Sequence, residues 1–329
     1  MKTGSLKQLL LIINPISGTS GSKEKLAPYI TRKLEGKGFK VDTVFTAGPG
    51  DATRLASEAV EKGYYGVIAC GGDGTVNEIA SALRDTETAL AIIPAGSGNG
   101  LARHIEIPID VELSVKVIAN DHVRRCDYCT VNGRPFFCTF GLGFDAAVSD
   151  RFARKKRRGL LTYFKSTLEE FIDFESDEYA IDVQNETLTE RAFLVACCNA
   201  SQYGNNAFIA PDASITDGVL DLIIVHNGNM LTRTLVGLEL VTGFIRKNAF
   251  VHKIRTDSVT IRRKKPGVAH IDGEPVELPA ELNVRCHPGG LLIMTPTKKT
   301  RFTPLITPLY YTLRDAGMAI GRLFRKRPE

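Results

Sequence analysis

The chain lacks the long apolar runs of membrane-spanning proteins. None of its hydrophobic stretches approaches the ~20 residues of a membrane helix. The longest one near the start, from Leu9 to Ile13, is too short for the core of a signal peptide. We therefore expect a cytoplasmic protein. With 329 residues, 43% hydrophobic and 24% charged, the composition is that of a globular chain rather than a disordered or fibrous one, and its length predicts roughly two domains.

The sequence also lacks the signs of a disulfide framework or a zinc finger. Its seven cysteines are odd in number and irregularly spaced from Cys70 to Cys286, which in a chain of this length indicates reduced thiols. Cys126 and Cys129 form a single close pair, without a second pair and without histidines at finger spacing. None of the six histidines belongs to a cluster with metal-ligand spacing along the sequence, so no histidine is assigned any chemistry.

Two common nucleotide-binding signatures are missing or misplaced. No string matches Gly-x-x-x-x-Gly-Lys-Ser/Thr, which excludes a Walker loop. The run Gly141 to Ala146 has dinucleotide-type glycine spacing, but it lies among the expected antiparallel strands. The ~20 residues that should lead from it to a ribose-binding acid hold a basic run instead. A dinucleotide site there is not expected.

Positive charge is small in total but concentrated. The net charge is only +5, yet six of the eight residues from Arg151 to Arg158 are basic, and Arg325, Lys326 and Arg327 crowd the C-terminus. Such runs predict contact with phosphate or an anionic lipid surface, not bulk nucleic-acid binding, unless they form a solvated face. Apolar residues from Leu309 to Phe324 share one helical face, which predicts an interfacial helix or packing on the first domain.

Hydrophobic patterning predicts two domains of different class. The first third alternates short apolar runs with helical patterns, which is typical of an α/β domain with a parallel sheet. From about Val123 many short strands rich in β-branched and aromatic residues predict a mostly antiparallel second domain. The expected limits are 1–125, 126–289, and 290–329 for a returning segment and basic C-terminal helix. Helices are expected at 22–35, 51–62, 75–83, 160–174 and 230–246, the last two as packing elements.

Three small-residue loops follow three of the expected parallel strands. The strongest is Gly71 to Glu78, in which three glycines within four residues allow close backbone approach to a ligand, and a helix start offers N–H groups to a phosphate. The carboxylate of Asp73 there favours a metal-bound nucleotide; a plain turn with an aspartate cap is the alternative. The other loops are Asn14 to Gly21 and Pro94 to Gly100. Because such loops share one sheet edge, we expect them to converge on one ligand.

Taken together, these motifs resemble the diacylglycerol kinase and sphingosine kinase family of lipid kinases. The resemblance rests on the three loops, on Gly141 to Asp145 and on the late Asp272-Gly273-Glu274, in the family's order over about residues 9–294. It implies an ATP-binding α/β domain of NAD kinase-like type, a β-sandwich lipid domain and an active site between them. The implied cofactors are ATP and Mg²⁺, the implied partners are a lipid substrate and a membrane surface, and a homodimer is a further expectation.

The resemblance also implies roles for individual residues. Asp73 would organise magnesium and phosphates, and Glu274 would be the general base, with Asp73 as the main rival for that role. The expected nucleotide contacts are Asn14, Thr46, Gly72, Gly74, Thr75, Ser97, Arg157 and Asp272. Asp217 would be the side-chain ligand of a structural metal, joined by Ser214 and Val219. The acid that binds the lipid amine in sphingosine kinases would fall near Ala147, where the carboxylates of Asp145 and Asp150 are close.

Three functions compete on this basis. The first is ATP- and Mg²⁺-dependent phosphorylation of a lipid hydroxyl, on diacylglycerol, a related lipid or a sphingoid base. The second is an NAD kinase-like activity, disfavoured by the Asp217 loop and the Asp272 turn. The third is a nucleotide- or lipid-binding module without turnover.

Overall fold

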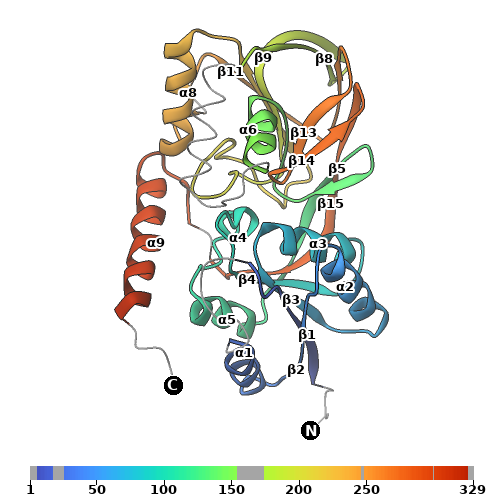
Figure 1. The fold of residues 1–329 in the computed structure, drawn as a ribbon, viewed down its shortest axis with the longest axis vertical. Coiled ribbons are helices and arrows are strands. Elements are labelled where there is room, and N and C mark those ends of the chain that lie inside the picture. The colour runs from blue at the N-terminus through green and yellow to red at the C-terminus, as the bar shows by residue number, and fades with distance from the viewer. Residues whose placement is uncertain (1–5, 18–25, 154–173, 246–247, 299, 325–329) are drawn as a thin grey trace. The chain divides into compact units, whose positions relative to one another are not determined.

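The structure, a computed structural model, describes residues 6–17, 26–153, 174–245, 248–298 and 300–324 (Figure 1). The chain divides into two compact units. The first comprises residues 1–126 and 290–329, and the second comprises residues 127–289. Arg157, the rest of the basic run from residue 154, most of the helix expected at 160–174, and Arg325 to Arg327 lie outside the described residues.

The first unit is built on a parallel sheet. Its strands are β1 (Lys7–Ile13), β2 (Phe39–Phe45), β3 (Gly66–Gly71) and β4 (Ala89–Pro94), in the order β2-β1-β3-β4. The last residues of β15 (Glu281–Met294) extend it beside β4 through the pair Ile293 and Leu90. Strands β3 and β4 are buried along their whole length, which explains their nearly continuous apolar sequence.

Helices connect these strands in the expected alternation. Helix α1 (Leu26–Glu35) follows β1, α2 (Asp51–Glu61) follows β2, and α3 (Asp73–Leu83) follows β3. The chain passes from β1 outward to β2 and then returns to β3 on the other side of β1. The carboxyl ends of β1 and β3 therefore flank the point where the direction of strand addition reverses, the usual ligand position in open α/β sheets.

The remaining helices of the first unit are α4 (Gly100–His104), α5 (Val111–Ala119) and α9 (Ile306–Phe324). Arg103 on α4 forms an ion pair with Asp315 on α9, and both side chains are largely buried. Tyr311 on α9 is buried as well, whereas Leu309 and Leu313 are exposed. The described part of the C-terminal helix thus packs on its unit through one face and leaves an apolar face open.

The second unit is mostly antiparallel. Strand β9 is central: its first half pairs with β8, and its second half pairs with β7 on one side and β10 on the other. The elements are β5 (Val123–Val131), β6 (Arg134–Phe136), β7 (Thr139–Gly143), α6 (Phe144–Ala153), β8 (Asp177–Val183), β9 (Glu186–Cys198), β10 (Leu220–His226), α8 (Met230–Thr242), β11 (Val251–Thr256), β12 (Ser258–Arg263), β13 (Gly267–Ile271), β14 (Glu274–Leu278) and β15. The predicted fold class, a parallel α/β domain followed by a mostly antiparallel β domain, is confirmed.

The chain breaks between β6 and β7 at Phe137 and Cys138. One local expectation for the second unit is wrong. The helix expected at 230–246 ends at Thr242, where Gly243 adopts the left-handed conformation that terminates helices. Its apolar residues were assigned to packing, but only Val236 on α8 is buried, and Leu231, Leu235 and Leu238 are exposed.

Candidate functional site

The carboxyl edge of the first unit's sheet brings the predicted loops together. The backbone N–H of the residue after a strand donates to a carbonyl of the neighbouring strand in three places. The N–H of Asn14 donates to the carbonyl of Cys70 at 3.0 Å. The N–H of Thr46 donates to the carbonyl of Ile13 at 2.9 Å, and the N–H of Ala95 donates to the carbonyl of Gly71 at 2.8 Å. Each bond extends a strand ladder by one residue, so four strands end at the same level. One edge of one sheet therefore carries Asn14, Thr46 and two glycine loops. We call these the Gly72 loop (Gly71 to Glu78) and the Gly96 loop (Pro94 to Gly100).

Asn14 connects the loop that follows β1 to the Gly72 loop. Its side-chain NH₂ group donates to the Thr75 hydroxyl at 3.0 Å, and its side-chain oxygen Oδ1 accepts from the N–H of Ile16 at 3.1 Å. Thr75 is buried in the first turn of α3, and Gly72 precedes that helix in an extended conformation. The N–H groups of the first turn of an 11-residue helix thus lie at this edge, where the helix dipole favours an anion.

The expected role of Asp73 toward magnesium and phosphates stays a prediction, and the visible role of its carboxylate is to accept from backbone N–H groups. Its two carboxylate oxygens accept from the N–H groups of Asn99 at 2.8 Å and Gly100 at 2.7 Å, which form the start of α4. Burial raises the pKa of Asp73 above its usual value, and the bonds from Gly100 and Asn99 oppose that rise. Asp73 therefore fixes the Gly96 loop against the first turn of α3.

The two glycine loops approach each other at backbone distance. A Cβ placed on Gly96 would lie 2.5 Å from the Cα of Gly72, and one on Gly98 would lie 2.7 Å from a carboxylate oxygen of Asp73. Asn99, in a left-handed conformation, closes the loop by exchanging side-chain hydrogen bonds with the N–H and carbonyl of Gly96. Ser97 is exposed at the tip of this loop, and Gly74 is exposed one residue after Asp73.

Glu78, the last residue of the Gly71 to Glu78 motif, has a structural role that the sequence does not predict. Its carboxylate accepts from the N–H groups of Gly50 at 3.0 Å and Ala52 at 3.1 Å. These N–H groups lie at the start of α2, which Gly50 precedes in a left-handed conformation. Glu78 thus couples α3 to α2. Its position one helical turn after Thr75 was the only sequence signal available for this role.

Glu274 lies at the end of a tight turn in the second unit. Strands β13 and β14 pair antiparallel with Ile271 opposite Glu274, and the two residues between them, Asp272 and Gly273, have φ of 49° and 85°. Two consecutive positive φ angles identify a type I′ hairpin turn, for which Asp-Gly is a preferred sequence. Glu274 is exposed, so its carboxylate is available to a ligand.

Asp272, in contrast, is engaged by the backbone. Its carboxylate accepts from the N–H groups of Phe137 at 2.9 Å, Cys138 at 2.7 Å and Thr139 at 3.0 Å. These donors lie at the break between β6 and β7. The expected nucleotide contact by Asp272 stays a prediction, but the visible role of its carboxylate is to hold the turn against this break.

A buried polar network supports the same turn. The N–H of Gly273 donates to Nδ1 of His270 at 3.3 Å, and Nε2 of His270 lies 3.0 Å from an oxygen of Asp145. The hydroxyl of Tyr203 donates to the same oxygen at 3.0 Å. With Nδ1 accepting, His270 is the tautomer whose Nε2 carries the proton. The carboxylate of Asp145 is therefore committed to positioning the turn.

The residues expected to hold a structural metal lie in the loop before β10. The carboxylate of Asp217 pairs with Arg255 on β11 and accepts weakly from the N–H of Val219 at 3.4 Å, and the Ser214 hydroxyl lies 3.2 Å from that of Thr216. The guanidinium of Arg255 occupies the place of a cation beside Asp217. The metal assignment stays a prediction, and it requires Arg255 to release Asp217.

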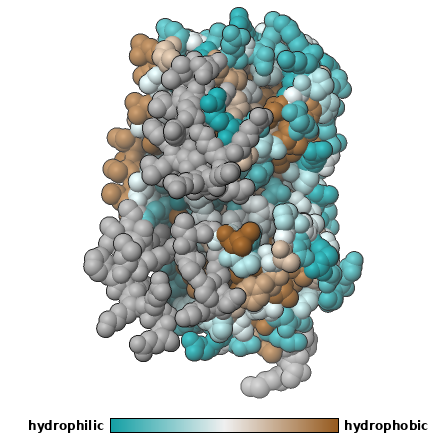
Figure 2. Space-filling view, viewed as in Figure 1, coloured by the Kyte–Doolittle hydropathy of each residue, from teal (hydrophilic) through white to brown (hydrophobic). Residues whose placement is uncertain are grey.

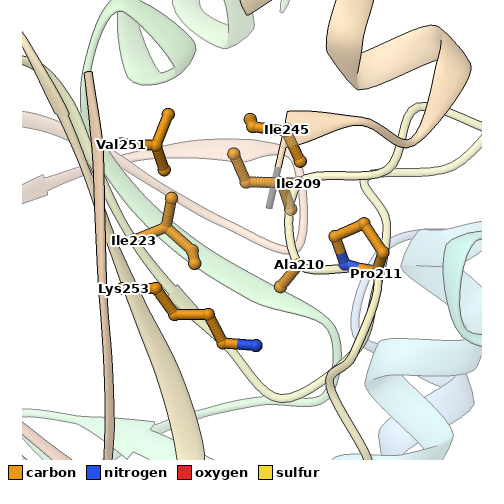
Figure 3. A pocket seen from close by; sticks show the side chains of 7 residues that line it. All are labelled: Ile209, Ala210, Pro211, Ile223, Ile245, Val251 and Lys253. Atoms are coloured by element: carbon orange, nitrogen blue, oxygen red, sulfur yellow. The ribbon is translucent and has the colours of Figure 1, made fainter. Parts of the chain in front are cut away.

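A small apolar pocket adjoins this loop. Figure 3 shows Ile209, Ile223 and Val251 facing one another, with the ammonium group of Lys253 at its rim. Lys253 pairs with Asp221 at 3.1 Å. Most of its apolar residues belong to one hydrophobic core cluster with residues of β9 and β10, so the pocket is a packing feature of this unit.

The comparisons with known proteins agree with the two-unit organisation. Residues 8–131 match the family model of the diacylglycerol kinase catalytic domain, and residues 139–295 match that of the YegS C-terminal NAD kinase beta sandwich-like domain. The fold and the matched families define a lipid kinase.

Relatives and solved structures support that class. A Staphylococcus saprophyticus protein named diacylglycerol kinase is 29% identical over 82% of this chain and 89% of its own length. A Cronobacter sakazakii protein named as a YegS-like lipid kinase is 30% identical over 66% of this chain and 74% of its own length. A crystal structure of a Bacillus anthracis diacylglycerol kinase superposes with a TM-score of 0.70 at 21% identity, covering 89% of this chain and 98% of that one, which shows the shared fold. The chain belongs to the diacylglycerol kinase and YegS-like family of lipid kinases.

Proposed function

We propose that this protein transfers the γ-phosphoryl group of ATP to the hydroxyl of diacylglycerol. The observation that carries the proposal is the convergence of Asn14, Thr46, the Gly72 loop and the Gly96 loop at the carboxyl edge of one sheet. The N–H groups at the start of α3 lie there beside Asn14 and the Thr75 hydroxyl, and the close packing of Gly72 against Gly96 leaves backbone rather than side chains between them. This is a suitable site for a triphosphate.

Phosphoryl transfer needs positioning and charge neutralisation more than a strong nucleophile. The N–H groups at the start of α3, with the hydroxyls of Thr46 and Ser97, would bind and orient the phosphates. Asp73 would keep the Gly96 loop in place. An Mg²⁺ ion on the phosphates would neutralise their charge. Asp73 fits such an ion, because a carboxylate has about four lone-pair sites and the bonds from Asn99 and Gly100 occupy two of them.

Glu274 is our candidate to accept the proton of the lipid hydroxyl. It is exposed, and the turn that carries it is held by Asp272 and by the His270 and Asp145 network. A general base needs this kind of fixed position. Arg157, expected to add positive charge near the phosphates, lies outside the described residues and stays a prediction.

Diacylglycerol is favoured over a sphingoid base by the surroundings of Asp145. A sphingoid base carries an ammonium group that a carboxylate would recognise. Asp145 is one of the two carboxylates near the expected position, and it already bonds to His270 and Tyr203. A neutral head group needs no such partner. The names of the relatives point the same way.

A lipid surface is the partner that we propose for α8. Figure 2 shows apolar side chains on the outer side of this helix. Met230, Leu231, Leu235, Leu238 and Val241 are exposed, and their spacing places four of them along one face. Exposed apolar faces of helices are suited to the headgroup region of a bilayer. No helix among the described residues is long and apolar enough to cross a membrane.

The function is tested by incubating the purified protein with labelled ATP, Mg²⁺ and detergent micelles that contain diacylglycerol, sphingosine or no lipid. We expect labelled phosphatidic acid in the organic phase with diacylglycerol only. A labelled product with sphingosine alone would replace the proposed substrate. Labelled aqueous NADP from added NAD would favour the NAD kinase-like alternative, and saturable ATP binding without any product would favour a binding module.

A further inference from the structure

Three neighbouring strands of the second unit bring together two histidines and a glutamate that are far apart in the sequence. Glu190 lies on β9, His226 is the last residue of β10, and His252 is the second residue of β11. The pairing of β9 with β10 shifts register between Val225 and His226. This bulge places His226 opposite Ala192, two residues from Glu190 and on the same face of β9.

The three side chains converge. Nδ1 of His226 lies 3.2 Å from a carboxylate oxygen of Glu190. The rings of His226 and His252 are nearly parallel, with an interplanar angle of 22° and centroids 6.5 Å apart. One potential ligand atom from each residue lies within 4.8 Å of the other two. Among the described residues, this is the group of histidine, cysteine and acidic side chains with metal-site geometry.

We propose that Glu190, His226 and His252 bind one zinc ion. Zinc with bonds of ~2.0–2.1 Å in a tetrahedron separates its ligand atoms by roughly 3.3 Å. The Glu190 and His226 pair already has this spacing, and the remaining contacts need to shorten by about 1.5 Å or less. His252 is exposed, so rotation of its side chain can provide this movement.

The chemistry of the donors selects the ion. Two imidazole nitrogens and one carboxylate form a ligand set known for Zn²⁺, with the fourth position left for water. Mg²⁺ prefers oxygen ligands only, so this site is distinct in kind from the one proposed for the nucleotide. A proton on His226 gives the same residues an ion pair with Glu190, and zinc would replace that proton.

The position of the site suggests its effect. Among the described strands, β11 pairs with β10 and with no other, so it is an edge of the sheet. A metal held by β9, β10 and β11 would tie this edge strand to the centre of the unit. Zinc binding would then stabilise the folded protein.

The experiment uses full-length protein without a histidine tag, stripped of metal with a chelator and titrated with ZnCl₂ in a calorimeter. We expect one zinc per chain and a higher melting temperature with zinc. His252→Ala and Glu190→Gln should weaken binding roughly tenfold or more and abolish the thermal shift. His122→Ala, which removes a half-buried histidine of the first unit, is the matched control and should bind like the parent.

Cobalt provides a second measurement of geometry. Co²⁺ added to the stripped protein should give the visible absorption of a four-coordinate ion, and His252→Ala should remove it while circular dichroism shows an unchanged fold. Equal zinc affinity in His252→Ala and the parent, or no saturable zinc binding by the parent, would overturn the proposal. Neither outcome would bear on the kinase activity, which is measured separately with Mg²⁺.

Discussion

At the scale of single residues, the two candidate catalytic carboxylates have different structural positions in their own units. Glu274 is exposed at the end of a turn, whereas the carboxylate of Asp73 is bonded to two N–H groups of α4. The expected consequences of changing them therefore differ in kind: replacing Glu274 should affect chemistry alone, and replacing Asp73 should also affect the shape of the two glycine loops.

Glu274→Gln should lower kcat by ~10²–10⁴, the range for a positioned general base, without a change in melting temperature. The substitution keeps the size of an exposed side chain and removes only its ability to accept a proton. Steady-state kinetics with diacylglycerol micelles measure the effect. Glu277→Gln, an exposed residue of the same strand, is the control. Similar kcat values for both variants would remove Glu274 from the mechanism.

Asp73→Ala should abolish turnover and also destabilise the protein by about 2 kcal/mol, because it leaves the buried N–H groups of Asn99 and Gly100 without their acceptor. Kinase assays and chemical denaturation measure the two effects. Asp73→Asn should retain part of the stability, because its amide oxygen can accept one of the two bonds. Normal stability together with lost activity would mean that Asp73 acts on the ligand alone.

Asp272→Ala should lower the free energy of unfolding on the order of 3 kcal/mol, because three backbone N–H groups at Phe137 to Thr139 lose their acceptor. Denaturant titration provides the measurement. If Asp272 serves mainly as a nucleotide contact, the variant would instead keep its stability and show a raised KM for ATP.

At the scale of elements, the sequence predicted the sheet edge well. Buried strands followed by small-residue loops in a βαβ pattern fix where the loops lie, because the carboxyl ends of parallel strands share one edge. Convergence of the loops on one edge could therefore be expected from the sequence. The hydrogen bonds by which Asp73 and Glu78 hold neighbouring segments could not be expected, because each carboxylate accepts from N–H groups more than 20 residues away in sequence.

The packing of α8 was mispredicted for a related reason. Apolar residues at helical spacing indicate an apolar face, but the sequence does not reveal what covers it. In the structure most of that face is exposed. The zinc ligands were missed because Glu190, His226 and His252 are neighbours only through strand pairing and a bulge, and no regular spacing along the chain indicates them.

Gly96→Ala should disrupt the contact between the two glycine loops. The added Cβ would lie 2.5 Å from the Cα of Gly72, which is backbone and cannot move aside without displacing the start of α3. We expect weaker ATP binding and a lower melting temperature. Gly48→Ala, where no atom lies within 4 Å of the added Cβ, is the control and should resemble the parent. Parent-like ATP affinity in Gly96→Ala would show that the loops can separate without loss.

At the scale of the whole molecule, the proposed contact of α8 with a lipid surface predicts how the protein would reach a substrate in a bilayer. Leu231→Ser combined with Leu238→Ser removes two residues that are 68% and 61% exposed on α8. We expect reduced sedimentation with lipid vesicles and reduced activity on diacylglycerol in them, because less apolar surface is buried in the lipid. Activity on short-chain diacylglycerol in solution should be unchanged.

The control for this prediction is Leu113→Ser, which removes a 40% exposed leucine from α5 of the first unit. It should bind vesicles like the parent. An equal loss of vesicle binding in both proteins would indicate a non-specific effect of surface hydrophobicity, and undiminished binding by the α8 double variant would exclude α8 as the contact.

The ion pair of Arg103 with Asp315 has a practical consequence for anyone who wishes to shorten this protein. The guanidinium also donates to the carbonyl of Gly98 at 2.9 Å, so the tail is connected to the loop that Asp73 holds. A chain cut ahead of Asp315 would keep a buried guanidinium that has lost this ion pair, and breaking a buried ion pair typically costs about 3–5 kcal/mol. The tail is therefore an integral part of the first unit, not a dispensable appendage.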